Sequence, residues 1–61
     1  MTEATEIVVV LKDEERTMRQ KFLHYGEVPT WTDLHNSIIE AKKNFPGDPE
    51  NVIVKTTMVV Q

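Results

Sequence analysis

The sequence predicts an α+β fold with the element order ββαβ, in which one helix packs on one face of a three-stranded antiparallel sheet. Residues 7–11 are all apolar, two further segments alternate between apolar and polar residues, and one segment carries apolar residues at helical spacing. A chain of 61 residues forms one domain, residues 1–61. Because so short a chain builds only a small core, we expect it to gain stability as a homodimer.

Residues 6–12 have the composition of a strand whose two faces are both apolar, because successive side chains point to opposite faces. A single helix covers only one of these faces. Burying one Val or Leu side chain stabilises a fold by roughly 1.5–3 kcal/mol, so we expect a second copy to cover the other face. The set that meets the helix is either Val8 and Val10 or Ile7, Val9 and Leu11.

Residues 13–16 are all charged and predict a tight turn. Thr17–Tyr25 then alternates as a second strand, antiparallel to the first. One side carries Met18, Phe22 and His24, and the other carries Arg19, Lys21, Leu23 and Tyr25. A helix over residues 14–23 is the alternative, because the apolar spacing there also tolerates helical periodicity.

The helix is predicted to begin after Thr30, whose hydroxyl can cap the first turn while the carboxylate of Asp33 reaches back. Lys42 and Lys43 suit the negative end of the helix, and Pro46 ends it. One apolar stripe follows from the spacing of Trp31, Leu34, Ile38, Ala41 and Phe45. After a turn at residues 46–49, Asn51–Val60 alternates as the third strand.

Ten acidic and seven basic residues give a net charge of −3, which disfavours binding to phosphate backbones or anionic membranes and favours a basic protein partner. The chain has no cysteine, which suits a reducing compartment. It also lacks the run of about 20 apolar residues that spans a bilayer. We therefore expect a soluble protein in the cytoplasm.

His24, His35, Asp33 and Ser37 are the residues from which a catalytic site could be assembled, but no nucleophile elbow or glycine-rich loop accompanies them. In the middle of a helix, Ser37 is expected to hydrogen-bond to the backbone. The spacing of the two histidines and Asp33 matches no four-ligand zinc set. We expect no enzyme activity, no metal and no cofactor.

Arg19, Lys21 and Lys55 could form a basic patch beside Tyr25, as in a small sheet that binds single strands. The acidic residues 13–15 would repel such a ligand, so pairing of these bases with acids across the strands is the favoured interpretation. The sequence therefore predicts no nucleic-acid partner.

Trp31 occupies the first helical position, where its ring either anchors the preceding loop to the core or stands at an interface. His35 and Ile39 form a second, narrower stripe on the same helix. A contact between the helices of two copies would explain this stripe, and so would an ordinary exposed isoleucine.

An acidic hairpin turn at residues 10–15 (VLKDEE) is followed by Tyr25-Gly26, the capped helix and residues 47–55 (GDPENVIVK). In topology, length and acidity the chain resembles the short dimeric inhibitors of uracil-DNA glycosylase made by small tailed phages of Bacillus. The resemblance implies a homodimer, in the host cytoplasm, that fills the DNA-binding cleft of a host or phage glycosylase. Carboxylates would stand in for phosphates, and an apolar pocket between two helices would capture the leucine that the enzyme inserts into DNA.

The helix departs from the family pattern, in which a cluster of aromatic residues lies beside a glutamate. The residues expected to line the pocket here are Trp31, Leu34, His35, Ile38 and Ile39. Glu40 is the expected phosphate mimic, with Glu27 and Asp33 as alternatives. A second hypothesis is a generic small dimeric interaction or regulatory domain whose partner is unrelated to DNA repair.

Overall fold

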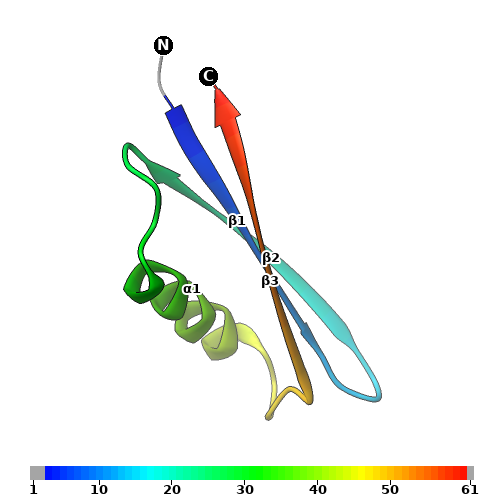
Figure 1. Ribbon diagram of the computed structural model, residues 1–61. Helices are drawn as coiled ribbons and strands as arrows, with labels where there is room; N and C mark the ends of the chain where they lie inside the picture. The colour runs from blue at the N-terminus through cyan, green and yellow to red at the C-terminus, as the bar shows by residue number, and fades with distance from the viewer. Residues whose placement is uncertain (1–2, 61) are drawn as a thin grey trace.

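The computed structural model describes residues 3–60 and has the predicted order ββαβ. Its elements are β1 (Glu3–Lys12), β2 (Thr17–Tyr25), α1 (Trp31–Asn44) and β3 (Asn51–Val60). The strands lie in the order β2-β1-β3 and both pairings are antiparallel. Figure 1 shows α1 on one side of the sheet. The second segment is therefore a strand, and the helical alternative for residues 14–23 is wrong.

β1 lies in the centre of the sheet and begins earlier than its apolar run indicates. The strand starts at Glu3, whose register partner is Val60, and Ala4 and Thr5 are buried between the two outer strands. A strand paired on both sides loses solvent along both edges, so small and polar residues there are covered as well as large apolar ones.

The core lies between α1 and the face of β1 that carries Ile7, Val9 and Leu11. From the helix side it is completed by Ala41 and Phe45. Of the two alternating sets of β1, the one that meets the helix is therefore Ile7, Val9 and Leu11, not Val8 and Val10. Partly buried residues surround this core, namely Met18, Phe22, Leu34, Ile38 and Val54.

Val8 lies on the other face of β1, where there is no helix, and yet it is only 7% exposed. Its register partners are Lys21 on β2 and Lys55 on β3. Long basic side chains cover apolar neighbours with their aliphatic stems while their charges stay in water. Burial of this residue therefore does not need a second copy, in contrast to the expectation from the apolar run alone.

α1 has the predicted capping box. The backbone N–H of Asp33 donates to the Thr30 hydroxyl at 3.2 Å, and the backbone N–H of Thr30 donates to the Asp33 carboxylate at 2.9 Å. The helix ends at Asn44, before Pro46, and Gly47 then adopts φ +88°, a left-handed conformation suited to glycine.

Two polar contacts join α1 to β2, near the two ends of the helix. The Asp33 carboxylate lies 3.9 Å from His24, and the side-chain amide of Asn44 donates to Gln20 at 3.2 Å. The core contacts of α1 are with β1, and the side chains of β3 that face the helix layer remain largely open, including Val52, Thr56 and Met58. The helix thus sits toward β2 and leaves a strip of β3 uncovered.

Ile7 and Ile53 lie on opposite faces of the sheet and are expected to contribute differently to the free energy of unfolding. Ile7 is 2% exposed in the core, whereas Ile53 is 44% exposed on the face without the helix. We expect Ile7→Ala to lower the free energy of unfolding by about 2–5 kcal/mol. The matched control Ile53→Ala is expected to lower it by no more than about 1 kcal/mol. Urea unfolding followed by circular dichroism measures both, and equal losses would contradict this description of the core.

Candidate functional site

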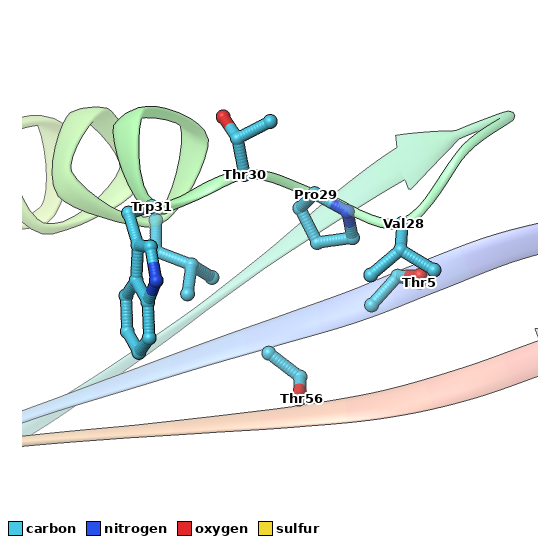
Figure 2. Close-up of a pocket in the computed structure, with 7 residues that line it drawn as sticks. Thr5, Val28, Pro29, Thr30, Trp31 and Thr56 are labelled. Atoms are coloured by element: carbon cyan, nitrogen blue, oxygen red, sulfur yellow. The ribbon is translucent and has the colours of Figure 1, made fainter.

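An apolar groove runs between α1 and β3, where the helix leaves the strand uncovered. It consists of two hollows, of about 540 and about 360 Å³, which meet at Trp31 and Leu34. The larger is lined by Thr5, Val28, Pro29, Thr30, Trp31, Leu34 and Thr56 (Figure 2), and the smaller by Trp31, Leu34, His35, Ile38 and Val54. We call the two together the α1–β3 groove.

Trp31 stands at the junction of the two hollows with 86% of its surface exposed. Figure 2 shows its ring extending from the first turn of α1 toward the strands. The ring is therefore not part of the core, which answers the question left open by its position in the sequence. Tryptophan is enriched among the residues that contribute most to protein interfaces, because it presents a large rigid surface.

The helical rotation of about 100° per residue explains why the apolar surface extends beyond the core. Ser37 and Ala41 are buried against the sheet. Around the helix from this buried side toward the groove come Ile38, then His35, then Ile39. Of these, Ile39 is exposed and Ile38 and His35 line the smaller hollow. The apolar sector of α1 is thus wider than the part of the sheet that it covers.

Four of the residues predicted to bind a partner come together in the smaller hollow: Trp31, Leu34, His35 and Ile38. Ile39 lies beside them but does not line the hollow. Val54 of β3 also lines it and was not among the predicted residues. The alternation of β3 had placed Val54 on the same side as Val52 and Met58, and that signal could have identified it.

The three candidate carboxylates are not gathered at the groove. Asp33 serves the capping box, and its carboxylate also accepts a hydrogen bond from the Thr30 hydroxyl at 3.1 Å. Glu40 lies 3.2 Å from the Lys43 ammonium, on the flank of α1 that also carries Asp33. Glu27 is exposed and directly precedes Val28, which lines the larger hollow.

The pKa of Asp33 is lowered from its ordinary value of 3.8. The main cause is the hydrogen bond from the backbone N–H of Thr30, followed by that from the Thr30 hydroxyl, with a smaller contribution from nearby His24. These donors favour the ionised carboxylate over the protonated one.

The residues considered for catalysis have structural roles or lie apart. Ser37 donates a hydrogen bond from its hydroxyl to the Asp33 carbonyl at 3.0 Å, as expected for a serine inside a helix. His24 is on β2 and His35 is at the groove. Within residues 3–60, no three side chains of His, Asp or Glu are arranged to hold a metal ion.

Residues 3–60 contain no helix with the length and apolar character needed to cross a bilayer. In comparisons with known proteins, no family model, no curated protein and no solved structure matched this chain.

The lowered pKa of Asp33 predicts how the stability of the chain depends on pH. Above the ordinary pKa the carboxylate is ionised in both folded and unfolded chains, and its stabilising effect is fully present. As the pH falls below 3.8, the unfolded chain binds a proton first and this stabilisation is lost. Thermal unfolding between neutral pH and about pH 3 should therefore show less acid destabilisation for Asp33→Asn than for the parent chain.

The control for this measurement is Asp48→Asn, which alters an exposed aspartate in the turn before β3. We expect this variant to keep the acid dependence of the parent. If Asp33→Asn also keeps it, the capping carboxylate is not the group responsible.

Proposed function

We propose that this protein is a noncatalytic inhibitor that binds uracil-DNA glycosylase as a homodimer and occupies its DNA-binding cleft. The observation that carries the proposal is the α1–β3 groove, in which an almost fully exposed Trp31 stands above an apolar floor. An apolar recess of this kind suits the capture of one apolar side chain from a partner, such as the leucine that a glycosylase inserts into DNA.

The proposed dimer forms through the free edge of β3. In the order β2-β1-β3 this strand has one unpaired edge, and Lys55 is its only charged residue. Uncharged edge strands pair readily with other strands, and charged residues are the usual means of preventing it. Antiparallel pairing of two β3 strands around a two-fold axis would give a six-stranded sheet with both helices on one side.

In such a dimer the two α1–β3 grooves adjoin each other across the axis. The floor would consist of two β3 strands, and Trp31, His35 and Ile39 would form walls on both helices. This arrangement resembles the apolar pocket between two helices that the family resemblance implies. It also gives a use to Ile39, which is exposed in the single chain.

The distribution of charge leaves the face opposite α1 basic and the rest of the chain acidic. The face of the sheet opposite α1 carries four basic residues and one acidic residue, although the whole chain has a net charge of −3. The excess of carboxylates therefore lies outside this face and mainly in the turns, since α1 itself carries two acidic and two basic residues. A cleft that binds phosphates has a positive potential, and an acidic partner surface associates with it rapidly. Glu27 directly precedes Val28 of the larger hollow, whereas the Asp33 carboxylate is engaged in the capping box, and we assign Glu27 the phosphate-mimicking role ahead of Glu40.

Removal of the Trp31 ring is the sharpest test of the groove. In an assay of uracil excision by a bacterial glycosylase, we expect the parent chain to inhibit and Trp31→Ala to inhibit at least about ten-fold less well, as for an interface hot spot. The matched control is Leu23→Ala, which removes another exposed large apolar side chain from the opposite side of the sheet. Undiminished excision with excess parent protein would refute the inhibitor proposal, and equal effects of the two variants would refute the role of the groove.

The dimer is tested independently by sedimentation. We expect the parent chain to sediment as a dimer at micromolar concentration and Ile39→Asp to sediment as a monomer, because a carboxylate would be buried without a partner. Asn36→Asp introduces the same residue elsewhere on the exposed surface of α1 and should remain a dimer. A parent chain that is monomeric at high concentration would remove the shared pocket and the proposed mode of inhibition with it.

A second candidate function is that of a generic dimeric interaction domain, which the same groove would also serve. It is distinguished from the first by the excision assay, since it predicts a dimer that leaves uracil excision unchanged.

A further inference from the structure

The face of the sheet opposite α1, which we call the open sheet face, gathers most of the basic residues of the chain. The register places Arg19 and Lys21 of β2 on one side of β1 and Lys55 of β3 on the other. Lys12 lies at the end of the same face. Glu6 is the one acidic residue among them.

Among the residues that the structure describes, only one of these basic residues has an acidic partner. The Lys21 ammonium lies 3.7 Å from the Glu6 carboxylate. Arg19 is the register partner of Val10, Lys55 is that of Val8, and neither side chain forms a salt bridge with a carboxylate in residues 3–60. The expectation that all these bases pair with acids across the strands is therefore wrong for Arg19 and Lys55, because the strand opposite them is apolar.

The open sheet face also has a shallow hollow and apolar surface beside its charges. A hollow of about 400 Å³ is lined by Glu6, Val8, Val10, Arg19, Lys55 and Thr57. Tyr25, at the end of β2, is 57% exposed on this face, and Leu23 and Ile53 are exposed there as well. Positive charge, a flat apolar floor and an exposed aromatic ring thus occur together.

The spacing of the charges follows from the geometry of the sheet. Residues two apart on a strand lie about 7 Å apart, and residues on β2 and β3 that share a partner on β1 lie about 10 Å apart. Such a row suits an extended flexible polyanion whose bases can stack on a ring, rather than the rigid phosphate array of a duplex.

We propose that the open sheet face binds single-stranded nucleic acid, with Arg19, Lys55 and Lys12 contacting phosphates and Tyr25 stacking on a base. The acidic turn at residues 13–16 lies at the Lys12 end of the face, away from Tyr25 at the other end of β2. Within that turn, the Asp13 carboxylate accepts hydrogen bonds from the backbone N–H groups of Glu15 and Arg16, at 2.8 Å each. The nucleic-acid strand is therefore expected to run from Lys12 across the hollow to Tyr25 at the far end of the face.

This site is separate from the proposed inhibitor site, because the α1–β3 groove lies on the other side of the sheet. It does not require a dimer. If two copies pair through β3, their open sheet faces join into one surface and the number of available phosphate contacts doubles.

The test is fluorescence anisotropy with a labelled oligothymidylate of about 12 nucleotides, a length within the usual site sizes of single-strand binders. With three phosphate contacts, we expect the affinity to fall about 20-fold between about 50 and 200 mM salt. The double variant Arg19→Gln with Lys55→Gln should bind more weakly and lose only about 3-fold over the same range, because one contact remains. Tyr25→Leu should bind at least about 5-fold more weakly than the parent, since it keeps an apolar side chain but cannot stack.

The matched control is Lys42→Gln with Lys43→Gln, which removes the same charge from the end of α1 on the other side of the molecule. We expect it to bind as the parent does. The proposal is overturned if the parent does not bind at about 50 mM salt, if the control loses as much affinity as the double variant, or if polyglutamate of equal length competes as well as the oligonucleotide. None of these outcomes depends on inhibition of uracil excision.

Discussion

The burial of β1 on both faces and along both edges is the constraint on which the rest of the structure depends. Five consecutive apolar residues have only one position in a three-stranded sheet that removes them from water, which is the middle. β2 and β3 must then flank this strand, and the connection between them must cross one of its faces. α1 makes that crossing and covers Ile7, Val9 and Leu11. On the other face, Val8 is flanked by the basic side chains of Lys21 and Lys55.

The lateral position of α1 determines the shape of the surface. Two polar contacts join α1 to the β2 side of the sheet: the contact of the Asp33 carboxylate with His24 and the hydrogen bond from Asn44 to Gln20. A helix centred over the sheet would have covered β3 and left a smooth surface. The observed position instead leaves the α1–β3 groove, with Trp31 at its centre. The shape of the groove thus follows from the position of α1 toward β2.

The elements could be predicted from the sequence because each has a local cause. The capping box, the helical stripe and Pro46 set the bounds of α1, and the alternation of β2 and β3 shows which residues share a face. The lateral position of the helix could not be predicted, because it is a matter of tertiary contacts between residues far apart in the chain, such as Gln20 and Asn44. For the same reason the unpaired state of Arg19 and Lys55 was missed, since only the register shows that valines lie opposite them.

The groove and the open sheet face give the molecule two sides of different chemistry. One side has an apolar groove, and the other is basic with an exposed tyrosine. The sheet between them is a single layer, so no residue of β1 can serve both sides. Substitutions on one side therefore leave the surface of the other intact, provided that the core is preserved.

The position of Trp31 has a consequence for spectroscopy. It is the only tryptophan of the chain, and its indole ring is in water rather than in the interior. Intrinsic emission will therefore report poorly on melting of the core, because the surroundings of the ring change little when the chain unfolds. The same emission should shift to shorter wavelength when another molecule covers the ring. The fluorescence of Trp31 therefore reports binding at the α1–β3 groove.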